Sequence, residues 1–205
     1  YSYASTSRVP AEVLGYKWEN VVIVRGRSDN HLPWMIGQFG SNTTYTASRG
    51  NYVAAVDAKT ELLEIGATVL GGAATDYDLK DEKIVHKTDA TKSMTFADAA
   101  KKAIELGGKY SGKDLPPDIN PLTKASAMAL AGSGLIGVAK DKLPKRGLTP
   151  GLVAGFVRSE LDRETGQGES LEYLVVADCG TVLHPEGLQT QIRGGSMMGF
   201  GLATT

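Results

Sequence analysis

Hydrophobic positions recur at helical spacing in the first third of the chain. Between residues 43 and 70, one row repeats at the interval of an amphipathic helix: Tyr52, Val56, Leu63, Ala67 and Leu70. Ser41 or Thr43 is suited to cap the N-terminus of this helix, and Gly71 and Gly72 are suited to end it. The pattern therefore predicts a helix of about 25 residues as the main element of the chain.

Shorter elements precede this helix. We expect a short helix within residues 1–20 that ends near Gly15 and Tyr16, and a buried strand at residues 21–24, a Val-Val-Ile-Val run. Residues 26–42 show no period and many turn formers, which predicts a long loop. Long ordered loops are often functional, so this loop is a first candidate for a site.

Two further elements follow the long helix. Residues 79–86 predict a hairpin that turns at Asp81 and Glu82. Thr95 is expected to cap a helix that runs through Leu106, since Thr-x-x-Asp is a capping signature and two glycines follow the segment.

The last quarter of the chain predicts a hairpin and a final helix. Residues 152–161 and 171–177 are expected to pair as antiparallel strands across a polar turn. Both strands carry apolar residues on both faces, which predicts a central position in a sheet. Pro185 then suits the first turn of a helix.

These elements define a fold class and a division of the chain. We expect an α+β (mixed α/β) fold, with long helices packed on a mixed or antiparallel sheet. Residues 1–150 would carry the strand, a ligand loop and the long helix, whereas residues 151–205 would form an incomplete domain. Residues 107–150 are only weakly periodic and read as an excursion between two lobes.

Composition removes several classes of protein. The 22 basic and 23 acidic residues give a net charge of −1, which argues against a nucleic-acid binder or a polybasic membrane protein. One cysteine and three scattered histidines argue against a disulfide framework and against a metal held by side chains. We expect a cytoplasmic location, with the periplasm as the alternative. Because the chain lacks an initial Met and ends abruptly, we expect it to be a stretch of a larger protein.

The first segment with candidate chemistry lies at the start of the long helix. Residues 40–44, Gly-Ser-Asn-Thr-Thr, place flexible backbone and hydroxyl or amide side chains at a helix N-terminus. Such an arrangement can bind a phosphate or a polar heterocycle without Lys or Arg. The alternative is an ordinary capped helix.

The second segment follows the last predicted strand. Asp178 and Cys179 enter a turn, and Gln191 lies inside the following helix, where its amide offers both a donor and an acceptor. The alternatives are that Cys179 is a small buried core residue and that His184 is a turn residue. A Gly-x-Gly-x-x-Gly stretch at residues 132–137 is a weak dinucleotide-binding signal, because no βαβ unit fits around it.

Taken together, these segments resemble the molybdopterin-binding large subunit of the molybdenum hydroxylases, the xanthine dehydrogenase and aldehyde oxidoreductase family. The resemblance rests on residues 40–44 before an alanine-rich helix, on the Asp-Cys-Gly-Thr turn at 178–181, and on the Gln-Ile-x-Gly-Gly stretch that begins at Gln191. It covers almost the whole chain, although residues 90–145 contribute little.

The resemblance implies a role for particular residues. The pterin dinucleotide would be bound by Gly40, Ser41, Asn42, Thr43, Thr44 and Gln191. Gln191 would approach the molybdenum oxo group, while the metal itself would be held by the pterin dithiolene and by no side chain directly. The general-base glutamate of the family is expected outside this chain, so the catalytic residue stays unknown. His184 and Arg193 depart from the family pattern, in which Asn and Glu are usual.

The resemblance also implies an activity and partners. The parent protein would be an oxidoreductase that hydroxylates an aldehyde or N-heterocycle carbon with water as the oxygen source. Its molybdopterin would be the cytosine dinucleotide form, and [2Fe-2S] and FAD groups would lie on partner domains or subunits. This chain alone is expected to be inactive. The alternative is a non-catalytic scaffold or interaction segment without bound cofactor.

Overall fold

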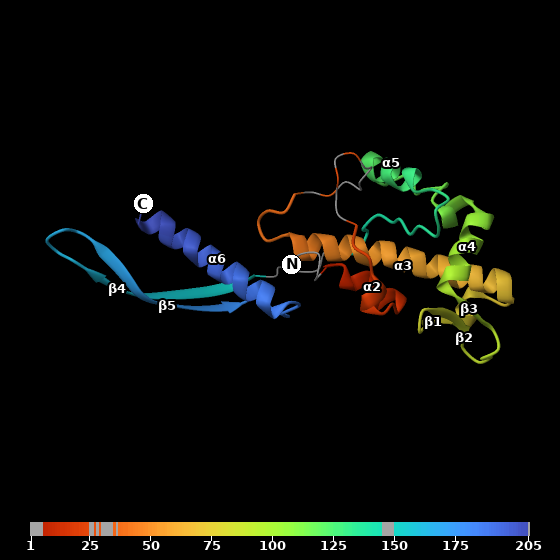
Figure 1. Ribbon diagram of the computed structural model, residues 1–205, viewed down its shortest axis with the longest axis horizontal. Helices are drawn as coiled ribbons and strands as arrows, with labels where there is room; N and C mark the ends of the chain where they lie inside the picture. The colour runs from red at the N-terminus through yellow and green to blue at the C-terminus, as the bar shows by residue number, and fades with distance from the viewer. Residues whose placement is uncertain are drawn as a thin grey trace. The chain divides into compact units, whose positions relative to one another are not determined.

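The computed structural model describes residues 6–24, 27, 29, 35, 37–144 and 150–204. It contains two compact units, Tyr1–Leu143 and Pro144–Thr205 (Figure 1). The helices and small antiparallel sheets make the fold α+β, as predicted.

Helix α3, Thr43–Leu70, is the long element of the first unit and has 28 residues. The Gly71 N–H donates to Ala67 O and ends the helix, as predicted. The prediction of a Ser41 or Thr43 cap is wrong. Asn42 occupies the N-cap with helical dihedrals, so its side chain does not take the extended geometry that lets a cap reach the first turn.

A three-stranded antiparallel sheet packs beside the C-terminal half of α3. Its strands are β1 (Tyr77–Lys80), β2 (Lys83–His86) and β3 (Ser93–Thr95), in the order β1-β2-β3. The predicted turn is confirmed, with Asp81 and Glu82 at φ of 51° and 59°. A short 3₁₀ helix, η2 (Ala74–Asp76), leads into β1.

Helix α4, Phe96–Leu106, closes the core of the first unit. The Oγ1 of Thr95 accepts the Asp98 N–H at 3.1 Å, which confirms the predicted cap. The buried cluster joins α3, the sheet and α4 through the following residues: Leu62, Ile65, Tyr77, Ile84, Phe96, Ala99 and Ala103. The core therefore lies at the end of α3 that is remote from residues 40–44.

The segments before α3 agree with the sequence only in part. Helix α2, Arg8–Leu14, ends at Gly15 as expected, and η1 (Trp18–Asn20) follows. Residues 21–24 form no strand, and Val22 is 84% exposed, so the buried-strand prediction is wrong. A β-branched run needs a partner strand to hydrogen-bond, and the described residues supply none. Of the predicted 26–42 loop, residues 27, 29, 35 and 37–42 form no helix or strand, and the others lie outside the described residues.

The excursion after α4 contains elements that the sequence pattern did not predict. These are η3 (Gly108–Ser111) and helix α5 (Pro121–Ala129). The Asn120 Oδ1 accepts the Leu122 N–H at 2.9 Å, and Pro121 stands in the first turn. Asn-Pro is a recognisable helix start, so this signal was present in the sequence.

The second unit consists of a hairpin and a helix. Strands β4 (Leu152–Leu161) and β5 (Gly168–Asp178) pair antiparallel with an irregularity between Arg158 and Ser159, and α6 (Pro185–Thr204) follows. The hairpin and the helix are confirmed. The rings of Tyr173 on β5 and Phe200 on α6 meet edge to face, with centroids 5.1 Å apart.

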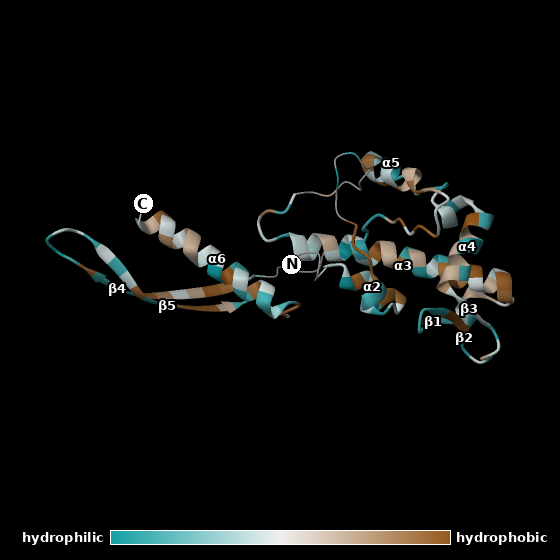
Figure 2. Ribbon diagram, in the orientation of Figure 1, coloured by the Kyte–Doolittle hydropathy of each residue, from teal (hydrophilic) through white to brown (hydrophobic). Residues whose placement is uncertain are grey.

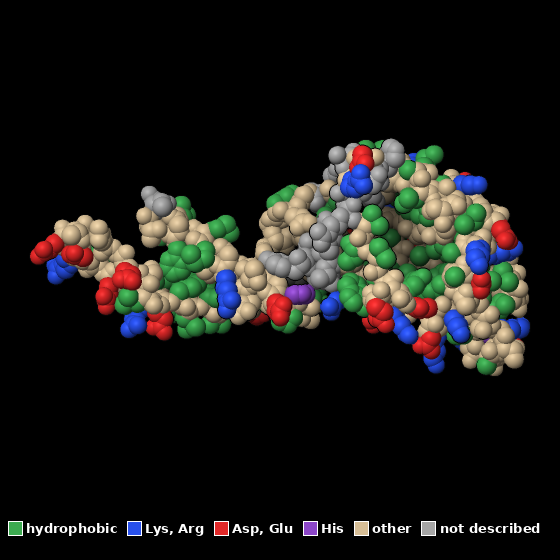
Figure 3. Space-filling model, in the orientation of Figure 1, with side chains coloured by type: hydrophobic (Ala, Val, Ile, Leu, Met, Phe, Trp, Pro, Cys, Tyr) green, Lys and Arg blue, Asp and Glu red, His purple; other side chains and the backbone are tan. Residues whose placement is uncertain are grey.

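The predicted central position of this hairpin is wrong for the described chain. The pair has no third strand, and its apolar side chains lie exposed, among them Phe156 at 62% and Val176 at 59%. Figure 2 shows hydrophobic residues along both strands, and Figure 3 shows such side chains gathered on the visible surface of this unit. No described element of the unit is large enough to cover both faces.

Candidate cofactor-binding site

The chain enters α3 through a turn with an unusual backbone. Gly40 and Ser41 both have a φ of 56°, in the left-handed region. Glycine adopts this region freely, whereas a side chain makes it strained, so Ser41 is a local exception. The Asn42 N–H donates to Phe39 O at 3.2 Å and closes the turn.

Two oxygen atoms, one at this turn and one further along α3, are buried without a hydrogen-bond partner among the described residues. They are Asn42 Oδ1 and Ser48 Oγ. A buried polar atom that lacks its hydrogen bond costs about 1–3 kcal/mol, so native proteins rarely leave one unmatched. These atoms are the signal expected where a polar ligand completes the hydrogen bonding.

The N-terminus of α3 offers the complementary donors. Its first N–H groups have no acceptor within the helix, and no side chain caps them. No acidic residue stands in its first turn, so the partial positive charge of the helix end is not neutralised locally. Backbone donors of this kind fit an anionic group such as the phosphate of a pterin nucleotide.

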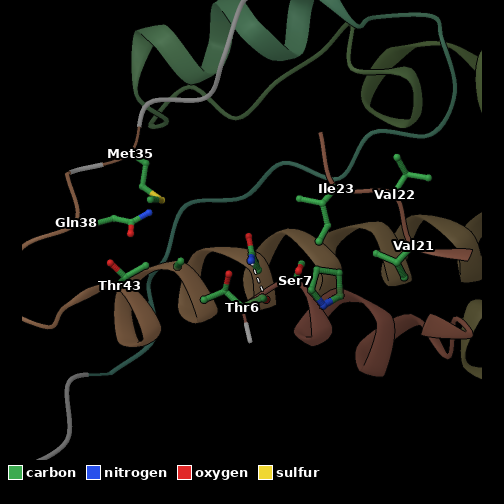
Figure 4. A pocket seen from close by; sticks show the side chains of 11 residues that line it. Thr6, Ser7, Val21, Val22, Ile23, Met35, Gln38 and Thr43 are labelled. Carbon is green, nitrogen blue, oxygen red and sulfur yellow. Dashed lines mark hydrogen bonds between the residues drawn. The ribbon is translucent and has the colours of Figure 1, made fainter. Parts of the chain in front are cut away.

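A cavity of about 340 Å³ lies beside the first turns of α3. Thr43, Ala47 and Asn51 line it from α3, at four-residue intervals on one face of the helix. Figure 4 shows Met35, Gln38 and Thr43 toward the start of the helix. The remaining lining residues come from the chain before α3: Thr6, Ser7, Pro10, Val21, Val22 and Ile23. The Asn51 Nδ2 donates to Thr6 O at 2.9 Å and fixes this wall.

Arg49 anchors α3 to the end of the first unit. Its guanidinium donates to both carboxylate oxygens of Asp141, at 2.6 and 3.0 Å, and to Leu143 O at 2.6 Å. Such a two-point contact fixes direction as well as distance. Sequence reasoning missed this residue, because nothing local links Arg49 to a partner 92 positions away.

The other candidate residues belong to the second unit. Gln191 lies on α6 and is exposed. His184 stands before α6, where its Nδ1 accepts the Gly187 N–H at 2.8 Å. Cys179 is exposed, so its interpretation as a core residue is wrong, since the turn after β5 has no packed core beneath it. Residues 40–44 and Gln191 thus fall in separate units.

Other readings of the sequence find less support. Residues 132–137 follow α5 and form neither strand nor helix, which excludes a βαβ dinucleotide-binding unit there. Within the described part of the chain, no group of three or more His, Cys, Asp or Glu side chains could hold a metal ion. No described helix has the length and apolar character that a bilayer crossing requires.

The backbone donors at the start of α3 and the buried Asn42 Oδ1 are compatible with a polar ligand. A family described as "Molybdopterin cofactor-binding domain" matches residues 2–205, and the chain belongs to this family. The resemblance to the molybdenum hydroxylases is thereby confirmed.

Two curated relatives of the chain are carbon monoxide dehydrogenase large chains. The chain is 25% identical over 197 residues to the carbon monoxide dehydrogenase large chain of Afipia carboxidovorans and to that of Hydrogenophaga pseudoflava. Each match covers 96% of this chain and 22% of the relative. The chain therefore spans about a fifth of the length of these relatives.

Solved structures show the same fold. The chain is similar to reconstituted CO dehydrogenase from Oligotropha carboxidovorans, with a TM-score of 0.61, 24% identity, and coverage of 94% of this chain and 21% of that one. It is similar to a carbon monoxide-reduced Cu,Mo-CO dehydrogenase with the same score and identity, covering 94% and 22%.

Proposed function

We propose that this chain forms part of the molybdenum-cofactor region of an oxidoreductase that hydroxylates an aldehyde or N-heterocycle carbon, with water as the oxygen source. The observation that carries the proposal is the start of α3, where Asn42 Oδ1, buried without a partner among the described residues, adjoins uncapped backbone donors. The family of the chain supports molybdopterin as the ligand that completes them. When bound, this cofactor would supply the redox chemistry.

The residues of the loop would hold the cofactor in place. Backbone N–H groups at the start of α3 would bind a phosphate, and Asn42 Oδ1 would accept from an amino or N–H group of the pterin. Ser41 and Thr43 would add hydroxyl groups, and Gly40 and Thr44 would flank them. This set accommodates a nucleotide-bearing form, and we propose molybdopterin cytosine dinucleotide.

Gln191 would act from the second unit. Its amide would donate to an oxygen on the molybdenum side of the cofactor and hold the reacting group in position. We propose that the general base lies outside this chain.

Carbon monoxide is a second candidate substrate. The observation that favours it is the name of the relatives, which are carbon monoxide dehydrogenase large chains. The residues that would contact a substrate are expected elsewhere in the large subunit.

Further segments of a large subunit, together with iron–sulfur and flavin partners, would complete the enzyme. Two observations support this proposal. The chain spans about a fifth of the length of its relatives. The exposed apolar side chains of β4, β5 and α6 are typical of a surface that packs against another segment or subunit. Electrons would leave toward the partner groups.

The alternative is a scaffold segment that binds no cofactor. Metal analysis of the purified full-length protein separates the two, together with fluorescence of the pterin after oxidation. We expect molybdenum and pterin in equal amounts. A protein purified from a molybdenum-replete host without either group would instead support the scaffold.

A further inference from the structure

A second cavity, of about 270 Å³, lies in the first unit beside the middle of α3, at Asp57 and Glu61. One part of its lining is charged, with the acids Asp57 and Glu61 from α3 and Asp114 from the segment after η3, and with the cation Lys109 from η3. Another part is apolar and consists of Leu115, Pro116, Ile136 and Val138. It shares no lining residue with the cavity at the start of α3.

Glu61 is the unusual member of this lining. Glu61 is only 4% exposed, and its Oε2 has no hydrogen-bond partner among the described residues. Burial, with a smaller contribution from the nearby carboxylate of Asp57, raises the pKa of Glu61 to about 8, although the ammonium of Lys109 acts to lower it. Lys109 is close enough to lower this pKa by its charge, but no described group donates a hydrogen bond to Glu61 Oε2, as one usually does to a buried acid.

The neighbouring donors serve other carboxylates. Glu64 Oε2 accepts from Lys109 Nζ at 2.6 Å and from the Tyr110 hydroxyl at 3.0 Å. Asp57 Oδ2 accepts the Val138 N–H at 2.8 Å. Because Lys109 is paired with Glu64, the acids that line the cavity outnumber the cations available to balance them.

From this arrangement we infer that the cavity is a binding site for a guanidinium or primary ammonium group on a short alkyl stem. The charged head would donate to Glu61 Oε2, with Asp57 and Asp114 as further anionic neighbours. The stem would pack against Leu115 and Ile136, as the stems of Arg and Lys do on apolar surfaces.

Two sources could provide this chemistry, a free small molecule or a basic side chain elsewhere in the same polypeptide. The site is separate from the proposed cofactor site, so its test does not depend on molybdenum.

The binding of a free ligand would also depend on pH. With its pKa near 8, Glu61 is largely uncharged at neutral pH. A cation favours the ionised form, so its binding releases a proton and strengthens as the pH rises toward 8.

Calorimetric titration of the full-length protein with n-propylguanidinium tests this inference, and the uncharged n-propylurea serves as the ligand control. We expect the wild type to bind the cation and not the urea, with proton release shown by the dependence of the heat on the buffer. Glu61→Gln should weaken binding at least tenfold and abolish the proton release. Glu105→Gln is the matched control, because Glu105 is exposed and paired with Lys102 on α4, and it should bind as the wild type does. Equal binding by the Glu61→Gln variant would overturn the site.

If the wild type does not bind the probe, thermal unfolding of wild type and Glu61→Gln at several pH values identifies the source. A basic side chain already in the cavity would lower the folded-state pKa of Glu61. The stability advantage of the wild type would then be present above pH 4.5 and be lost as the pH falls. An empty cavity leaves that pKa raised, so the advantage is present below 4.5 and is lost as the pH rises toward 8. The first result assigns the site to an internal cation, and the second overturns the inference.

Discussion

Ser41 is the residue of the candidate site whose backbone departs most from ordinary preference. A φ of 56° is uncommon for a residue with a side chain, and such strain persists only where the surrounding structure enforces it. The sequence predicted a polar segment at residues 40–44, because its composition is visible in one dimension. It could not predict that the N-cap residue would be Asn42 instead of Ser41 or Thr43. That choice depends on the turn made by Gly40 and Ser41.

Gln191 allows a test at the scale of a single side chain. We predict that Gln191→Ala lowers turnover of the full-length enzyme by about tenfold or more while molybdenum is retained, because a positioned hydrogen bond acts mainly in the transition state. The assay is steady-state turnover together with molybdenum content. Gln189→Ala, an exposed neighbour on α6, serves as the control and should leave turnover unchanged. Equal turnover of both variants would remove Gln191 from the site.

Helix α3 joins the candidate site to the core, and its two ends have different roles. Its N-terminal turns border the cavity at Thr43, whereas Ile65 and Leu62 pack into the buried cluster at the far end. The buried cluster holds the far end of α3, and Arg49 and Asn51 hold the part near its start. The position of the loop before α3 therefore depends both on these contacts and on packing near the C-terminus of the same helix.

Gly66 provides a test of that packing. A Cβ at Gly66 would lie 2.7 Å from the Ile84 side chain, which is fully buried, so Gly66→Ala should destabilise the protein by about 1–3 kcal/mol. Gly50 lies on the same helix in open space, so Gly50→Ala should stabilise it by about 0.5–1 kcal/mol. Urea unfolding of both variants measures the difference. Shifts of the same sign and size would contradict the packing described for α3.

Elements with local start and stop signals were predictable from the sequence. The caps of α3 and α4 at Gly71 and Thr95, and the turn at Asp81, all depend on residues within a few positions. The Val-Val-Ile-Val run at 21–24 failed as a strand because pairing needs a distant partner that no local pattern reveals. The pair of Arg49 and Asp141 was missed for the same reason, since the two residues are 92 positions apart in the sequence.

At the scale of the molecule, the two units differ in how far they bury their apolar residues. The first has a core around Ile65 and Tyr77, whereas in the second Gly187 is the only described residue that is buried. The hairpin β4–β5 carries the apolar pattern of a central strand pair, and its neighbours are not among the described elements. The pattern predicted the strands correctly but could not show what would cover them.

We propose that residues at the start of α3 hold the molybdenum cofactor. The most direct measurement is the molybdenum content of the purified full-length protein carrying Ser41→Ala with Thr43→Ala. The control is Thr60→Ala, which removes an exposed hydroxyl on the same helix that donates to Val56 O. Losing two hydrogen bonds of about 0.5–1.5 kcal/mol each should weaken cofactor retention about tenfold or more. We predict that molybdenum falls well below the wild-type level in the double variant and stays unchanged in Thr60→Ala. Full occupancy in the double variant would contradict the claim and leave residues 40–44 as the turn that begins a helix.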